Sequence, residues 1–199
     1  MSTPPFTDAG LAADFNWSTD LGIFKTLLGG KPRWENESHD LYETVVAQAR
    51  QEAFYLRGRV ADSIDGRFDL VVLHAFLLFR RLGRIGGEAL DLSQKTFDLM
   101  FADFDGCLRE MGVSDMGMAP KIKKMAKAFF GRIQAYDGTL DTPDALSDAL
   151  ARNLYRGKMD DPAVLRAMVA YVRAQAALLD AQEDAALMQG RLRFSAPEL

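Results

Sequence analysis

The 199-residue sequence has few of the residues from which catalytic and metal sites are usually built. It contains one cysteine, Cys107, and two histidines, His39 and His74. A single cysteine cannot form an internal disulfide, which fits a reducing compartment. The histidines do not form a His-Glu-x-x-His zinc motif, and neither a Gly-x-Ser-x-Gly nor a Gly-Lys-Ser/Thr motif occurs. We therefore expect neither an enzyme nor a resident cofactor.

Long apolar runs and an excess of positive charge are absent as well. The net charge is −4, so we expect no sequence-specific binding of nucleic acid. The most apolar stretch, FDLVVLHAFLLFRRL, offers ten positions between Asp69 and Arg80, whereas a membrane-spanning helix needs about 20. This stretch is therefore predicted to be a buried helix. The first residues match neither a secretory signal nor a transit peptide, which favours a cytoplasmic protein.

Apolar residues recur at helical spacing along most of the chain, and no alternating run is long enough for a sheet. We predict an all-α, single-domain bundle of about six helices with an extended N-terminal segment. The expected regions are an N-terminal tail (1–37), a helical domain (38–190) and a C-terminal tail (191–199). A short amphipathic helix in the N-terminal tail would carry Leu21, Phe24, Leu27 and Leu28 on one face.

Caps, glycines and prolines predict where the helices begin and end. Residues 53–66 are predicted to be an irregular connection that ends in an Asp65-Gly66 turn. Pro120 suits the first turn of a helix, as do the prolines at 143 and 162. The first predicted helix begins near Ser38, and the second and third cover about 68–82 and 91–111. The fourth begins near Pro120, the fifth runs from Pro143 to about Gly157, and the sixth runs from Pro162 to about Met188.

Polar groups on apolar helices allow more than one interpretation. His74 is most simply a core histidine, with Asp69 as its predicted hydrogen-bond partner, although a lone histidine can also ligate haem or a metal. Cys107 is predicted to be a buried thiol. Asp105 lies four residues before Arg109, which predicts a surface ion pair. The di-metal helical bundles carry a Glu-x-x-His repeat that this sequence lacks.

A basic stretch, KIKKMAKAFFGR, stands out in this net-acidic chain. It contains five basic side chains and no acid, placed over an apolar helix face. A solvated helix face is one interpretation. Contact with anionic lipid, ribosomal RNA or an acidic partner is the other. The predicted membrane or ribosome contacts are Lys121, Lys123, Lys124, Lys127 and Arg132.

Four blocks of sequence together are similar to one protein family. They are LYETVVAQARQEAFYLRGRVADSIDGRFDLVVLHAFLLFRRL, FDLMFADFDGCLREMGVSDMG, KIKKMAKAFFGRIQAYDGTL and LARNLYRG. In this order, over about residues 40–157, they resemble the ubiquinol–cytochrome c chaperone family. These are the alphaproteobacterial relatives of the mitochondrial chaperone that assembles respiratory complex III.

The resemblance implies a helical, non-enzymatic chaperone that binds newly made cytochrome b, or another membrane-protein client, and needs no cofactor. It also implies a cytoplasmic protein that acts at the inner membrane, with ribosome or membrane-surface contact as a further expectation. Methionine and phenylalanine are plentiful and suit variable clients. Adjacent aromatic residues cannot all face one core, because neighbours on a helix are about 100° apart. The predicted client contacts are Phe54, Tyr55, Phe76, Phe129 and Phe130.

Two other functions remain open at the level of the sequence. One is a helical carrier of haem or a quinone, bound near His74. The other is a peripheral membrane adaptor that acts through the segment 15–28 and the basic stretch. Titration with haem and flotation with vesicles would separate these two alternatives from a chaperone.

Overall fold

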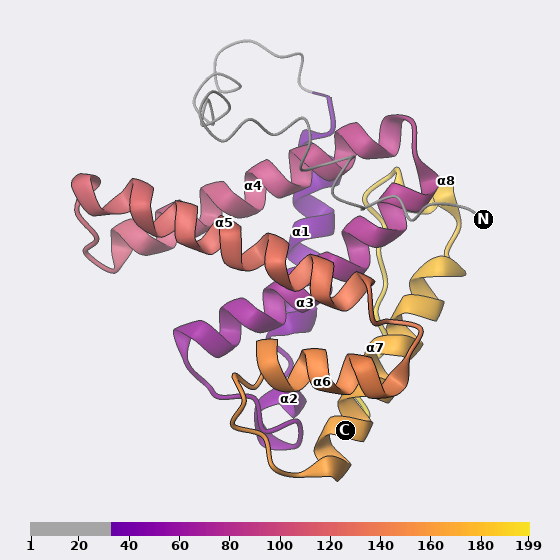
Figure 1. Cartoon of the computed structure of the whole chain (residues 1–199). Helices are drawn as coiled ribbons and strands as arrows, with labels where there is room; N and C mark the ends of the chain where they lie inside the picture. Colours follow the sequence, from indigo (N-terminus) through magenta and orange to yellow (C-terminus); the bar gives the residue numbers. More distant parts are fainter. Residues whose placement is uncertain (1–32) are drawn as a thin grey trace.

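The computed structural model describes residues 33–199, whose regular elements are all helices with no strand among them, as predicted. The short helix predicted in the N-terminal tail lies outside the described residues. The six predicted helices are present, and two helices of four residues accompany them (Figure 1). The bounds are α1 Glu35–Ala49, α2 Ala53–Leu56, α3 Ile64–Ile85, α4 Glu88–Glu110, α5 Asp115–Asp137, α6 Pro143–Asn153, α7 Pro162–Asp180 and α8 Asp184–Leu187.

Helix α3 is the centre of the core, as its apolar sequence predicts. It packs against α1, α4, α5 and α7. Its buried positions run around the whole helix, from Leu70 to Leu82, because neighbours cover it on several sides. No helix within residues 33–199 combines the length and the apolar character that crossing a membrane requires.

The connection predicted at 53–66 contains more structure than expected. It includes α2, and α3 already begins at Ile64, so the predicted Asp65-Gly66 turn is wrong: both residues lie in the first turn of α3. The Ser63 side chain caps this turn by accepting a hydrogen bond from the Gly66 amide at 3.1 Å. A Cβ atom at Gly66 would lie 2.0 Å from the Ala61 carbonyl oxygen, so only glycine fits here.

The far ends of α4 and α5 project from the body as an antiparallel pair (Figure 1). We call residues 105–127 the arm. Its turn uses Gly112 at φ +81°, and the Val113 amide donates to the Leu108 carbonyl at 3.1 Å. Pro120 does not begin α5 but lies inside it. Proline there removes one hydrogen bond, to the carbonyl of Met116, and solvent can replace it because Met116 is 93% exposed.

The last predicted helix is interrupted. It ends at Asp180, and only α8 continues toward Met188. The buried Arg81 of α3 explains the break, because its guanidinium donates to the carbonyl of Leu179 at 2.8 Å and to that of Gln182 at 2.7 Å. These carbonyls would otherwise serve a continuing helix. Beyond α8 the chain turns back along α7 and ends near α2 (Figure 1). We call residues 191–199 the strap.

Candidate functional site

The aromatic residues predicted as client contacts lie mostly inside the protein. Phe54, Phe76 and Phe129 are buried, whereas Tyr55 and Phe130 are half-buried. Phe129 joins a cluster of rings between α3, α4 and α5, with centroid distances of 5.4 Å to Phe97 and 6.0 Å to Phe79. In this conformation the three buried rings stabilise the core. A client would reach them only if the covering segments moved.

The four lysines of the basic stretch are exposed on the arm. None of them forms an ion pair within residues 33–199, whereas Arg109 pairs with both Asp105 and Asp115 at 2.7 Å. The predicted Asp105–Arg109 pair is thus confirmed. On α5, Lys123 and Lys127 follow Met116 by seven and eleven residues, so all three side chains lie on one side of the helix.

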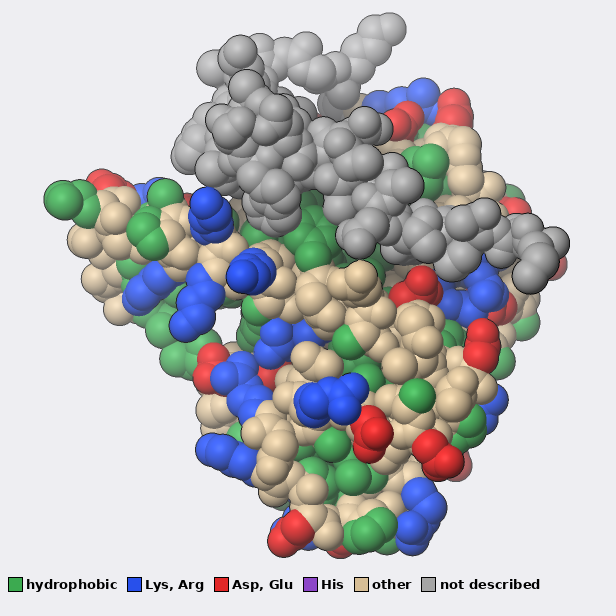
Figure 2. All heavy atoms as spheres, in the orientation of Figure 1, with side chains coloured by type: hydrophobic (Ala, Val, Ile, Leu, Met, Phe, Trp, Pro, Cys, Tyr) green, Lys and Arg blue, Asp and Glu red, His purple; other side chains and the backbone are tan. Residues whose placement is uncertain are grey.

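The arm therefore combines free positive charge with exposed apolar side chains. Met116 is 93% and Met111 53% exposed, and both lie at the turn that joins α4 to α5. Figure 2 shows lysine and arginine side chains along the arm and hydrophobic side chains at its tip. Such a surface suits contact with an anionic, partly apolar partner such as a lipid headgroup layer.

Arg132, which the basic stretch predicted as a fifth surface cation, points inward instead. Its Nη2 atom lies 2.8 Å from Oδ1 of Asp69, a carboxylate with no exposed side-chain area. Arg156 binds the other carboxylate oxygen through Nε at 3.0 Å and reaches Asp65 through Nη1 at 2.7 Å. Burial raises the pKa of Asp69, and the two guanidinium groups oppose that rise. The group ties α3 to α5 and to the loop after α6.

His74 is fully buried, and both of its ring nitrogens have partners. Nδ1 lies 2.8 Å from the Leu70 carbonyl, which can only accept, so Nδ1 carries the proton. Nε2 then accepts from the Tyr171 hydroxyl at 2.7 Å. Asp69, the predicted partner, bonds to arginines and not to His74. Burial lowers the pKa of His74 to about 4, only partly offset by the bond to Leu70. A neutral, hydrogen-bonded imidazole of this kind supports the interpretation as a core histidine.

Two further polar features are exposed. Cys107 lies on the surface, so the prediction of a buried thiol is wrong. Partial burial together with Asp103 and Glu110 raises the pKa of its thiol, which makes Cys107 a poor nucleophile. His39, Asp40 and Glu43 group their ligand atoms on one exposed turn of α1, but exposed acids at helical spacing gather in this way without an ion.

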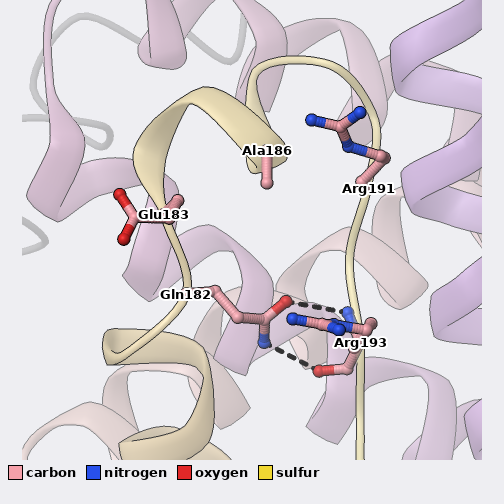
Figure 3. Close-up of a pocket in the computed structure, with 5 residues that line it drawn as sticks. All are labelled: Gln182, Glu183, Ala186, Arg191 and Arg193. Carbon is pink, nitrogen blue, oxygen red and sulfur yellow. Dashed lines mark hydrogen bonds between the residues drawn. The ribbon is translucent and has the colours of Figure 1, made fainter.

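Sequence reasoning missed the site at the strap, because its partners are glutamines on α1, on α7 and in the turn after α7. Gln182 binds both backbone groups of Arg193: its Oε1 accepts from the amide at 2.9 Å and its Nε2 donates to the carbonyl at 2.8 Å (Figure 3). Gln175 Oε1 accepts from the Ser195 amide at 3.0 Å, and Gln48 Nε2 donates to the Ser195 carbonyl at 2.8 Å. A lone glutamine carries no sequence signal for such a role.

The chain is similar to proteins of one kind. A family model described as ubiquinol-cytochrome C chaperone matches residues 57–194. Ubiquinol-cytochrome c reductase complex assembly factor 1 of Mus musculus is 28% identical over 156 residues, which cover 77% of this chain and 53% of that protein. Its Homo sapiens counterpart is 28% identical over 149 residues, which cover 74% of this chain and 50% of that protein. The chain thus spans about half the length of these relatives.

A solved structure agrees with the sequence matches. The crystal structure of the Cbp3 homolog from Brucella abortus superposes with a TM-score of 0.76 at 32% sequence identity, covering 89% of this chain and 97% of that one. The family model spans more than half of the chain and includes α3, the arm and all of α7. The resemblance seen in the four sequence blocks is confirmed, and the chain belongs to the ubiquinol-cytochrome c chaperone family.

Proposed function

We propose that the protein is a non-enzymatic chaperone for the assembly of respiratory complex III. Its client in this proposal is newly made cytochrome b, held until haem and partner subunits join. The observation that carries the proposal is the family match over residues 57–194, together with relatives that are named as complex assembly factors. The polar groups inside the protein are consistent with it, because His74 and Asp69 are engaged in bonds to other residues of the core.

The arm gives this chaperone a means of staying near its client's membrane. Its lysines, which form no ion pair with any described residue, and the exposed Met111 and Met116 fit an anionic surface, either of the inner membrane or of the ribosome that makes the client. Tyr55 and Phe130, which are half-buried, are proposed as client contacts in the conformation described. Phe54, Phe76 and Phe129 are proposed as contacts only where a covering segment opens.

The test is a deletion strain of the organism that carries the protein. Assembled complex III, measured on native gels and by its haem absorbance, should fall while transcripts of its subunits stay unchanged. The wild-type gene should restore it. Photo-crosslinking from positions 55, 116 and 130 should then capture cytochrome b. Normal levels of complex III in the deletion strain would contradict the proposal.

A carrier of haem or a quinone is the weaker alternative. The one described histidine within the core, His74, has no free nitrogen for a metal, and its hydrogen bonds to Leu70 and Tyr171 would have to break first. If the purified protein nevertheless gave a Soret band on haem titration that His74→Ala removed, this alternative would replace the chaperone.

A further inference from the structure

The strap is held mainly through its backbone, although Gln175 Nε2 also donates to the Ser195 hydroxyl. Gln182 bonds both backbone groups of Arg193, Gln175 and Gln48 bond those of Ser195, and Arg57 donates to the Pro197 carbonyl at 3.1 Å. Bonded residues recur at every second position, as they do when an extended chain lies in a groove. Backbone carbonyls are common to all residues and backbone amides to all but proline, so the backbone contacts set little requirement on sequence.

The side chains between the bonded positions supply the apolar contacts. Leu192 is buried, and the ring of Phe194 meets that of His74 edge-on, with centroids 5.4 Å apart. His74 in turn contacts the ring of Phe54 at 5.2 Å, so an aromatic floor lies beneath the strap. We call the walls and floor the strap groove; its residues are Gln48, Phe54, Arg57, His74, Tyr171, Gln175 and Gln182.

The strap does not fill the space available to it. A hollow of about 320 Å³ lies where the strap begins, lined by Gln182, Glu183, Ala186, Arg191 and Arg193 (Figure 3). A second hollow of about 200 Å³ lies where it ends, lined by Arg57, Gly58, Ala163, Val164, Ala167 and Leu199. These open hollows leave room for side chains bulkier than those of the strap.

We propose that the strap groove is a binding site for an extended polypeptide, which the chain's own strap occupies when no client is present. Its second occupant is an extended apolar segment of the client, with a large apolar side chain where Phe194 now lies. This inference rests on the proposed chaperone function for the identity of the occupant. The backbone contacts accept most sequences without proline at the amide-donating positions, which suits a client that is still unfolded. Displacement of the strap also uncovers the aromatic floor that includes Phe54.

The tethered strap competes with any second chain at a high effective concentration, so it must be weakened for the test. Two variants of the full chain change the strap and leave the groove intact. Phe194→Ser removes the ring above His74, and Ser195→Pro removes the amide that donates to Gln175. The probe is a fluorescent peptide with the sequence of residues 191–199. By fluorescence anisotropy, both variants should bind it about tenfold or more tightly than wild type does.

Three controls define the groove. Adding Gln175→Leu to the Phe194→Ser variant should abolish the gain, because it removes a groove contact. A peptide with serine in place of its phenylalanine should bind at least about tenfold more weakly. A peptide with lysine in place of its two arginines, whose side chains are exposed, should bind equally well. Folded variants that bind the peptide no better than wild type would overturn the proposal, as would binding that ignores the phenylalanine.

Hydrogen exchange on the wild-type chain provides a test that needs no variant. The amides of Arg193 and Ser195 should exchange at least about 100-fold faster than the core amide of Val172, because the strap opens without unfolding of α7. Exchange of the strap amides only together with Val172 would overturn the proposal. Neither measurement involves complex III. If the groove binds the peptide but deletion of the protein leaves complex III unchanged, the groove stands as a peptide-binding site and the proposed function fails.

Discussion

Asp69 is a buried carboxylate held between the guanidinium groups of Arg132 and Arg156. The sequence placed Asp69 on the apolar helix but could not reveal its partners, which follow 63 and 87 residues later along the chain. Helical spacing says which residues share a face of one helix. It does not say which neighbouring helix meets that face. Charge alone therefore places Arg132 with the exposed lysines of the basic stretch.

Removing this carboxylate should destabilise the protein strongly. Asp69→Ala leaves the largely buried guanidinium of Arg132 without its counter-charge and Arg156 with only the exposed Asp65, so we expect the free energy of unfolding to fall by about 3–5 kcal/mol. The matched control is Asp65→Ala, which removes the exposed partner of the same Arg156 and should cost no more than about 1 kcal/mol. Denaturant unfolding measures both, and equal losses in the two variants would refute a special role for the buried charge.

Two tyrosines make a second comparison at the residue scale. The Tyr136 hydroxyl is buried and has no hydrogen-bond partner among the described residues, whereas the Tyr155 hydroxyl donates to the Gly58 carbonyl at 2.8 Å. Tyr136→Phe should therefore raise the free energy of unfolding by about 1 kcal/mol, and Tyr155→Phe should lower it by about 1 kcal/mol. Thermal melts of the two variants check the opposite signs. A loss in Tyr136→Phe would mean that its hydroxyl has a partner.

At the scale of elements, the arm shows what periodicity can and cannot predict. The spacing of Phe97, Phe101 and Phe104 in α4 correctly predicted a helix with an inward face. It did not predict that the ends of α4 and α5 extend beyond the body, where Met111 and Met116 are exposed. Whether a helix face is covered depends on the length and direction of its neighbours, which no local pattern encodes.

Charge reversal on the arm should weaken binding to anionic vesicles. Each lysine near such a surface contributes about 1 kcal/mol, so Lys123→Glu with Lys127→Glu should weaken binding about 10- to 30-fold. Lys158→Glu with Arg173→Glu makes the same change of net charge on exposed residues outside the arm and should have little effect. Flotation with vesicles of neutral and anionic lipid is the measurement. Indifference to lipid charge and to salt would exclude an electrostatic contact.

The ends of the helices also differ in whether nearby or distant residues determine them. Ser63 caps the start of α3 by accepting from the amide of Gly66, three residues later, so the local sequence is enough to predict this cap. The end of α7 at Asp180 instead depends on Arg81, almost 100 residues earlier, whose side chain takes the carbonyls of Leu179 and Gln182. Sequence signals at 181–188 are those of a continuing helix, so the predicted end near Met188 was wrong for a tertiary reason.

At the scale of the whole molecule, the strap and the core are joined through one polar network. His74 binds Tyr171, Tyr171 accepts from Gln48 at 2.9 Å, and Gln48 binds the strap at Ser195. These residues come from α3, α7, α1 and the strap. Closing the fold therefore requires a neutral imidazole at its centre, since a charged one would be desolvated without a counter-charge.

This network predicts a loss of stability in mild acid. The pKa of His74 is about 4 in the folded protein, while an unfolded histidine titrates near 6.5. As pH falls through this window, only the unfolded chain gains the proton, so the free energy of unfolding falls by about 3 kcal/mol. His74→Gln should remove this part of the pH dependence, whereas His39→Gln, at an exposed position, should keep it. Denaturant unfolding from about pH 7 to about pH 4 measures the slopes, and identical slopes in His74→Gln and wild type would disprove the assignment.

By itself the sequence determined the all-α class, the six long helices and the central, buried position of α3, because these follow from the spacing of apolar residues along the chain. It also determined the family, since four blocks in a fixed order are specific. Only the tertiary structure decided that Arg132 turns inward, that Cys107 is exposed and that the strap lies in a groove lined by glutamines. Each of these depends on segments that meet in space from distant parts of the chain, and such meetings leave no periodic trace in the sequence.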